Sequence, residues 1–274
     1  MQKKLITLAK YVLQHHFDHV LPFSIYCVGQ TQVIRNVPIS KPLLIFVLSG
    51  VKEFGQHGDV QCLSGEFILL STTKQIDMRN IPDQDDYVAV LIDFDYDDFN
   101  GLPQSVGECQ PYIRGTISPM LGTSLIQLIE LSLIAPLSVM VARKKELLKL
   151  IYYSGYTNIC QLYKDLTVSE KVYALLSTNM SKDWTVKQIA SSLFMSPSTL
   201  RRKLKNESES LYGIKHRIRL GYGLHLVQAT KMRIGDIALE CGYMSQSRFT
   251  AQFKQLFTMT PREIRNTKLR VESE

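Results

Sequence analysis

The sequence predicts an α+β protein: an N-terminal β barrel or jelly roll, then helices, then an all-α domain with two helix-turn-helix units. Three observations support this prediction. Short apolar runs separated by Gly, Pro and Asp turns fill residues 23–99. Helical periodicity replaces them from about residue 118. One helix-turn-helix pattern then occurs twice, at 189–205 and at 237–254.

The β region is predicted from its apolar runs. We expect buried strands over 42–50, 60–63, 67–70 and 87–94, with turns at Gly50 and at Ser64 and Gly65. Residues 1–20 have the texture of a short amphipathic helix or an arm. Residues 100–117 contain several Gly and Pro and are expected to form a loop.

Two apolar helices are expected after the barrel, from about 118 to 133 and from 140 to 152. They form either a dimer interface or a cover for the β core, and the sequence leaves both open. Residues 153–168 carry few signals and are interpreted as a linker. The predicted domains are therefore 1–165, with the barrel at about 23–99 and helices at about 118–165, and 166–274.

Charge differs between these two parts. From Val168 onward there are 18 Lys and Arg against 9 Asp and Glu, a balance of +9. Residues 1–167 hold the remaining 14 basic and 16 acidic residues, a balance of −2. A basic domain joined to a near-neutral one indicates a polyanionic partner for the basic domain, although a solubilising surface gives the same balance.

The chemistry-bearing residues favour a non-enzymatic, metal-free protein. The acidic run Asp93, Asp95, Asp97 and Asp98 fails as a calcium loop, because its sixth and twelfth positions are Asp98 and Gln104 instead of Gly and Glu. It is interpreted as an exposed turn. No nucleophile–base grouping is evident, so no catalytic residue and no cofactor are expected.

The predicted location is the cytoplasm. No signal-peptide core and no apolar run of about 20 residues is present, so no membrane association is expected. The cysteines are odd in number, scattered and without a CxxC pair, which fits a reducing compartment. They are Cys27, Cys62, Cys109, Cys160 and Cys241.

The first helix-turn-helix unit begins at Thr185, a predicted N-cap with Gln188 at the capping-box spacing. Ser196 and Pro197 open its second helix as N-cap and first helical residue. Leu200 and the residue four positions later pack inward. The outward face is polar and basic, as insertion into a DNA groove requires. Its residues are Ser198, Thr199, Arg201, Arg202 and Lys205.

The second unit repeats this plan with a turn one residue longer. Gly242 permits the turn, where a positive φ is expected, and Ser245 caps the second helix. Phe249 and Phe253 take the inward positions. The outward residues are Gln246, Ser247, Arg248, Thr250, Ala251 and Lys254. One long helix is expected to connect the units over 211–230, with a bend at Gly221 and Gly223.

The residues of the second unit resemble the AraC family of bacterial transcription regulators. The resemblance rests on Ile-Ala at 237, Cys-Gly-Tyr at 241, Ser-Gln-Ser at 245 and Thr-Pro at 260, and it covers about 166–266. Residues 194–205 are particularly similar to the branch of enteric virulence-gene activators. Thr258 departs from the pattern, because the family usually has Gly there.

The resemblance implies a cupin-like regulatory domain joined to a seven-helix DNA-binding domain. It places base readers at Ser198, Arg201 and Arg202 in the first unit and at Gln246 and Ser247 in the second, with Thr250 on a phosphate. Arg202 is expected to contact guanine. Ala251 stands at the matching position of the second unit, where relatives often carry Arg, so that unit is expected to act more as an anchor.

We therefore expect a sequence-specific transcription regulator that activates virulence genes. Its expected partners are double-stranded promoter DNA and RNA polymerase, and it is expected to form a homodimer. Some relatives of the virulence branch bind fatty acids in the N-terminal domain. An apolar effector such as a fatty acid is expected here too, with Arg35 or Lys41 meeting its carboxylate. The alternative is an N-terminal domain that binds a partner protein and no ligand, which a closed core without a cavity would favour.

Overall fold

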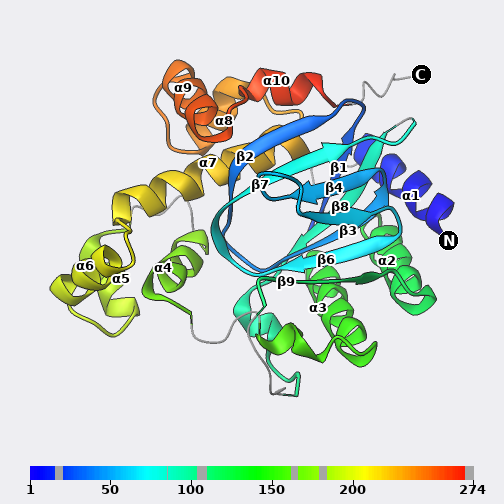
Figure 1. The fold of residues 1–274 in the computed structure, drawn as a ribbon, viewed down its shortest axis with the longest axis horizontal. Coiled ribbons are helices and arrows are strands. Elements are labelled where there is room, and N and C mark those ends of the chain that lie inside the picture. Colours follow the sequence, from blue (N-terminus) through cyan, green and yellow to red (C-terminus); the bar gives the residue numbers. More distant parts are fainter. Residues whose placement is uncertain (16–20, 85, 104–109, 162–165, 179–183, 269–274) are drawn as a thin grey trace.

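The structure is a computed structural model that describes residues 1–15, 21–84, 86–103, 110–161, 166–178 and 184–268. Its N-terminal half contains two packed antiparallel sheets (Figure 1). The five-stranded sheet has the order β1 (Ser24–Val28), β8 (Tyr87–Asp93), β3 (Leu43–Ser49), β6 (Glu66–Leu70) and β9 (Tyr112–Thr116). The four-stranded sheet has the order β2 (Gln32–Ile39), β7 (Thr73–Ile81), β4 (Val51–Phe54) and β5 (Val60–Leu63). The predicted fold class is confirmed, with the β domain built as a two-sheet sandwich.

The central strands β3 and β8 are buried on both faces, which explains their unbroken apolar sequences. Successive side chains of a strand point to opposite faces. Ile45 and Val47 therefore face the second sheet, whereas Leu44 and Phe46 face a layer of helices. Each residue of such a strand must be apolar, so no polar alternation is visible in the sequence.

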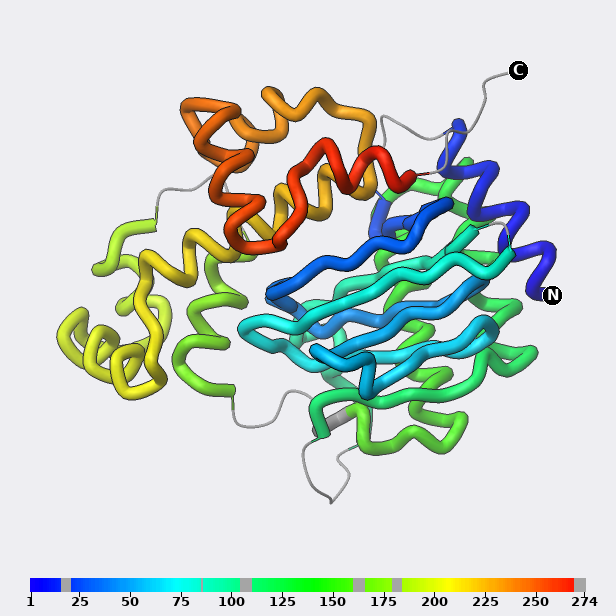
Figure 2. The backbone as a smooth tube through the Cα atoms, turned by 45° about the horizontal axis from the view of Figure 1, so that its top comes forward, coloured from blue at the N-terminus to red at the C-terminus, as the bar shows by residue number. Residues whose placement is uncertain are grey.

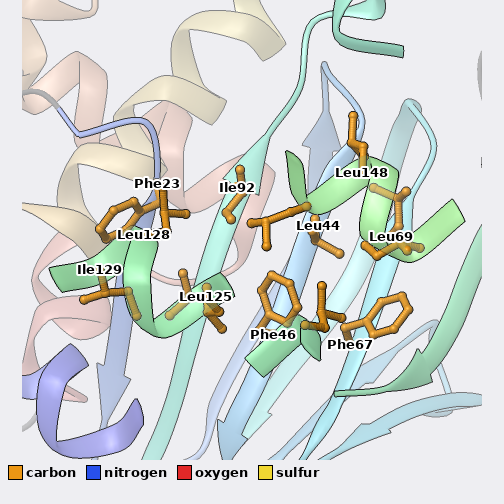
Figure 3. Close-up of a cluster of buried hydrophobic side chains, with 14 of the residues drawn as sticks. Phe23, Leu44, Phe46, Phe67, Leu69, Ile92, Leu125, Leu128, Ile129 and Leu148 are labelled. Atoms are coloured by element: carbon orange, nitrogen blue, oxygen red, sulfur yellow. The ribbon is translucent and has the colours of Figure 1, made fainter. Parts of the chain in front are cut away.

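Helices α1 (Gln2–His15), α2 (Pro119–Leu131) and α3 (Leu137–Tyr153) cover the outer face of the five-stranded sheet. Figure 3 shows Leu125 and Leu128 of α2 and Leu148 of α3 in one cluster with strand residues, Leu125 beside Phe46, Leu128 beside Phe23 and Leu148 beside Leu69. Of the two roles predicted for these helices, the cover is the one observed. Ile134 and Leu137 remain exposed at the turn between α2 and α3, and homodimer formation stays a prediction.

Two segments expected to be irregular belong to the β domain. Residues 112–116, placed in a loop from their sequence, form the edge strand β9 and pair with β6. A Cβ on Gly115 would lie 2.2 Å from the Tyr156 hydroxyl, so this glycine permits close packing of the chain that follows α3. Within the predicted linker, Tyr156 packs edge-on against Phe67, and Ile159 of the 3₁₀ turn η2 (Thr157–Gln161) is buried in the same core.

The acidic run has a structural use that the sequence did not indicate. Asp98 closes the 3₁₀ turn η1 (Tyr96–Phe99) by accepting the Asp95 N–H. Its carboxylate also pairs with Lys144 at 3.2 Å and with Lys145 at 3.0 Å, both on α3. These contacts lower the pKa of Asp98 despite the opposing effect of burial. The run thus ties β8 to α3, and no metal-binding cluster occurs among the described residues.

Within residues 166–178 and 184–268, which the structure describes, seven helices follow the β domain. The first unit comprises α4 (Val168–Ser177), α5 (Val186–Ser192) and α6 (Pro197–Asn206), with the start of α7 (Leu211–Ala229). The second comprises α8 (Ile234–Glu240), α9 (Gln246–Phe257) and α10 (Pro261–Asn266), packed on the end of α7. Figure 1 shows α4–α6 beside the sandwich and α8–α10 above β2, with α7 running between them. Among the described helices, none is long and apolar enough to cross a membrane.

Helix α7 is unbroken through the two glycines that were expected to bend it. A Cβ on Gly223 would lie 2.8 Å from the Phe249 ring, and one on Gly221 would lie 2.9 Å from Pro38 of the β domain. The predicted bend at these glycines is therefore wrong, and the two residues serve another purpose. They let α9 and β2 approach the helix closely, at the usual cost of glycine in a helix interior.

The second unit packs directly on the β domain, as Figure 2 shows for the last helices and strand β2. One continuous apolar cluster joins the interior of the sandwich to the core of α7–α10. Hydrogen bonds to backbone carbonyls also connect the second unit to the β domain. The Gly29 N–H donates to the Thr267 carbonyl at 2.9 Å, and the Asn36 side chain donates to the Leu256 carbonyl at 2.9 Å. The second unit therefore shares its core with the β domain.

Candidate nucleic-acid interface and interdomain cavity

Helices of both units begin at the predicted caps. The Thr185 hydroxyl accepts the Gln188 N–H at 3.2 Å, and Gln188 accepts the Thr185 N–H at 3.0 Å, completing the capping box of α5. The Ser196 hydroxyl accepts the Thr199 N–H at the start of α6. Ser245 does the same for α9. Each cap satisfies backbone donors that a helix start leaves unpaired, which fixes where α5, α6 and α9 begin.

The turns of the two units begin with the same backbone geometry on different residues, although the second turn is one residue longer. Phe194 adopts φ +54° in the first unit, and Gly242 adopts φ +75° at the matching place in the second. In both, the next N–H donates back to the alanine carbonyl, from Met195 to Ala190 and from the second unit's tyrosine to its alanine. The positive φ predicted for Gly242 is confirmed, and the first unit makes the same turn with an aromatic residue.

In the first unit, the predicted DNA-binding residues lie on the exposed side of α6, opposite Leu200 and Leu204. Arg201, Arg202 and Lys205 are exposed and make no ion pair with any other described residue. The hydroxyls of Ser198 and Thr199 are close to that of Ser196, at 2.9 Å each, and Thr199 is half-buried. The three cations are thus presented along one free face.

In the second unit, α9 presents a face with less positive charge. Gln246, Ser247, Arg248 and Lys254 are exposed, and Thr250 is half-buried. Ala251 is exposed at the place that matches Arg202. The inward residues Phe249, Phe253 and Phe257 stack edge-on or tilted in a row along the buried side.

Two apolar side chains beside these faces were not singled out from the sequence. Phe194 is 99% exposed and Met244 is 95% exposed, one in the turn of each unit. Thr258 ends α9 with φ +65°, so it makes the turn for which the family usually has Gly. A left-handed conformation is unfavourable for residues with a Cβ, so Phe194 and Thr258 are both strained.

A cavity of about 310 Å³ lies between the sandwich and the helical domain. It is lined by β1, β2, β3, β4, β7 and β8 on one side and by α4 and α7 on the other. Most of its wall is apolar, as is typical of small-molecule sites. The apolar wall residues include Ile34, Val37, Ile39, Leu43, Met78, Leu91, Ile218 and Leu224.

The two residues proposed from sequence to meet a carboxylate fall in different places. Lys41 lines the cavity, but its ammonium is 2.7 Å from Asp95 and 3.7 Å from Asp93. Burial opposes its charge, yet these carboxylates outweigh burial and raise the pKa of Lys41. Arg35 is exposed on β2 and is not part of the cavity wall.

Further polar groups of the cavity were missed from the sequence. Lys52 and Asn80 line it from β4 and β7, and Tyr26 and His225 approach across it with 3.3 Å between hydroxyl and ring nitrogen. Burial lowers the pKa of His225 and raises the pKa of Tyr26, so both are neutral at neutral pH. The alternation of β4, in which Lys52 and Phe54 share a face, was the available sign of an inward lysine.

Comparison with known proteins finds relatives of the helical region. A family model described as a helix-turn-helix domain matches residues 189–267. The transcriptional regulator AdiY of Escherichia coli is 36% identical over 94 residues, and SirC of Salmonella typhimurium is 35% identical over 96 residues. These residues form an AraC-type helix-turn-helix domain. The matches cover 34–35% of this chain, 37% of AdiY and 32% of SirC, so the chain matches about a third of these relatives' length.

Outside the AraC-type domain, the comparison is one of fold. The structure of an apo ToxT variant from Vibrio cholerae superimposes with a TM-score of 0.65 at 16% identity, over 92% of this chain and 99% of ToxT. A ToxT structure with bound unsaturated fatty acid gives 0.60 at 17% identity, over 92% and 97%. The two-sheet sandwich and the helical domain thus occur together in the same fold in both proteins.

Proposed function

We propose that this chain is a sequence-specific DNA-binding transcription regulator in which α6 and α9 enter successive segments of the major groove. The observation that carries the proposal is the pair of capped, exposed second helices held on one helix. Helix α7 has 19 residues, a length of about 28 Å at 1.5 Å per residue. That is near the roughly 34 Å between successive major grooves on one DNA face. The AraC-type domain supports the same function.

The two reading helices have unequal tasks in this proposal. Arg202 of α6 reads a guanine through two parallel hydrogen bonds, supported by Arg201 and Ser198. Gln246 and Ser247 of α9 read bases more weakly, because Ala251 has no donor to offer where Arg202 stands in the first unit. Thr250 and Lys254 hold phosphates, which adds affinity without sequence preference.

The interdomain cavity is proposed as the site of a small apolar effector such as a fatty acid. An effector there would touch the sandwich, the end of α4 at Ser177 and the middle of α7 at Ile218 and Leu224. It would therefore bear on the helix that joins the two units. The ligand seen in the ToxT structure supports this class of compound. The cavity favours an effector over the alternative of a ligand-free, partner-binding β domain.

We further propose that the regulator is an activator of virulence genes that contacts RNA polymerase. The similarity of residues 194–205 to the branch of enteric virulence-gene activators is the basis of this proposal.

The test begins with selection of genomic DNA fragments by the purified chain, followed by titration of the recovered site. Arg202→Ala should lose about 1–3 kcal/mol at one base pair and tolerate other bases there. Lys205→Ala, the matched control on the same face, should weaken all sequences alike and reduce the salt slope by about one. Equal binding of wild type and Arg202→Ala to every site would contradict the base-reading role, and recovery of no preferred site would contradict the function.

A further inference from the structure

Lys52 is a buried residue of the cavity wall with most of its hydrogen-bonding capacity unused. Its side chain belongs to a residue that is 2% exposed, on strand β4. The ammonium donates to the Asn80 side-chain oxygen at 2.6 Å, and the rings of Phe54 and Tyr87 lie 5.5 and 5.8 Å away. An ammonium has three donors, and the described residues supply one hydrogen-bond acceptor. The cavity is the remaining direction from which an acceptor can come.

No negative charge compensates this ammonium. Cys62 faces it from β5 and Tyr87 from β8, and burial raises the pKa of both, to about 12 for Cys62. Across the cavity, Tyr26 on β1 and His225 on α7 are neutral, and Lys41 already holds Asp93 and Asp95. The buried Tyr87 hydroxyl also has no hydrogen-bond partner among the described residues. Burial without a counter-charge lowers the pKa of Lys52 to about 7.

A chain of buried amides runs from Lys52 to the helical domain. Asn80 donates to the Gln32 oxygen at 3.0 Å, and Gln228 of α7 donates to the same oxygen at 2.8 Å. Gln32 in turn donates to the Thr267 hydroxyl at 2.7 Å, directly after α10. All of these side chains are buried. A change at Lys52 is therefore connected by hydrogen bonds to both α7 and the end of the second unit.

We propose that Lys52 anchors the carboxylate of the effector, and that it takes up one proton from solvent when that carboxylate binds. This inference rests on the proposed function of the cavity as an effector site. A carboxylate at this position supplies the missing acceptor and the missing charge, and an opposite charge within a few ångströms favours the ammonium. Lys41 lacks this property, because its charge is already matched by two carboxylates. The ligand arrives ionised and reacts no further: the one bond formed is the third N–H bond of Lys52, whose proton is released by the solvent or buffer acid.

The inference is tested by calorimetric titration with decanoate and with 1-decanol at pH 8.5, in two buffers of different ionisation enthalpy. For the wild type, decanoate binding should take up about one proton and decanol binding none, because Lys52 is mostly neutral before binding. In Lys52→Met, decanoate should bind at least tenfold more weakly without proton uptake, while decanol binds as before. Lys41→Met is the matched control and should keep the proton uptake.

Each outcome separates the inference from the function on which it rests. Decanoate binding of unchanged strength to Lys52→Met, or without proton uptake by the wild type, overturns the role of Lys52 and leaves the effector site standing. Binding of decanol alone does the same. Failure of both ligands to bind overturns the effector site and the inference together. Lys52→Gln is the second variant: it can hydrogen-bond Asn80 but cannot titrate, so proton uptake by this variant also overturns the proposal.

Discussion

The two helix-turn-helix units share one plan but are attached to the β domain in different ways. The second unit shares an apolar core with the sandwich and is joined to β2 by buried hydrogen bonds. The first unit has a core of its own and reaches the sandwich through side chains near its surface, where Lys74 pairs with Glu209 at 3.4 Å and Thr72 with Glu170 at 3.3 Å. This difference in attachment agrees with the proposed division of tasks, in which the first unit reads bases and the second acts more as an anchor.

The largest effect should come from truncating one core side chain in each unit, which tests whether the two units are attached to the β domain in different ways. Phe253→Ala should lower the free energy of unfolding by about 3–5 kcal/mol, and Leu204→Ala by about 2–5 kcal/mol, because both side chains are fully buried. The difference should lie in where protection is lost. Hydrogen exchange of β2 should accelerate in Phe253→Ala and stay unchanged in Leu204→Ala. Equal acceleration of β2 in both variants would contradict the separate attachment of the units.

The next effect concerns Lys52, whose hydrogen-bond chain ends at the second unit. Folding lowers the pKa of Lys52 from 10.5 to about 7, so folding disfavours the charged lysine. The penalty is fully present below pH 7 and disappears as pH rises from about 7 to 10.5, since the unfolded chain there binds more protons. Lys52→Met should therefore raise the free energy of unfolding near pH 7 by on the order of 4 kcal/mol.

Urea unfolding at a series of pH values measures this effect. The gain from Lys52→Met should shrink steadily between pH 7 and 10.5, and Lys41→Met should show no such trend. A gain that does not depend on pH would mean that Lys52 is charged in the folded protein throughout this range.

A smaller effect should come from the turns, where the units differ at one backbone position. Phe194→Gly should stabilise the chain by up to about 1 kcal/mol, because glycine adopts φ +54° without strain. Gly242→Ala, its counterpart in the second unit, should destabilise by about the same amount or more. Thermal unfolding monitored by circular dichroism compares the two. Destabilisation by Phe194→Gly would show instead that the exposed ring contributes a stabilising contact.

The smallest effect should follow from cutting the surface link of the first unit. Lys74 is 48% exposed at its side chain, and Glu209 keeps Arg217 as a second partner. Lys74→Met should therefore change the free energy of unfolding by less than about 1 kcal/mol, a change that added salt should reduce further. A loss of several kcal/mol would show that the first unit is attached to the β domain as strongly as the second.

Local rules predicted the helical domain well from the sequence. Caps at Thr185, Ser196 and Ser245, the inward pairs and the positive φ of Gly242 each depend on neighbours a few residues away, and all are confirmed. Glycines 221 and 223 were misinterpreted because their reason lies in other elements, β2 and α9. The same limit applied to β9, whose partner is β6, more than forty residues earlier.

The two candidate sites differ in the same way, because one depends on residues close in sequence and the other on distant elements. The exposed positions on α6 and α9 follow from helical spacing, so they could be predicted, although their contact with DNA remains a prediction. The cavity could not be predicted, because its walls come from six strands and two helices. Lys41 and Arg35 were both proposed from the sequence, and the structure places only Lys41 on the cavity wall. Lys52 was overlooked because no strand was predicted over residues 51–54, so the alternation of Lys52 with Phe54 was not used.

The continuity of α7 has a consequence for the DNA that the chain selects. Its first half is built into the core of the first unit through Ile214 and Ile218, and its second half into the core of the second through Leu224 and Val227. Neither end can turn without the other. Each base pair inserted between two half-sites rotates one of them by about 34° around the duplex axis. A helix that cannot be twisted to follow such a rotation makes the phase of the two half-sites as strict a requirement as their base sequence.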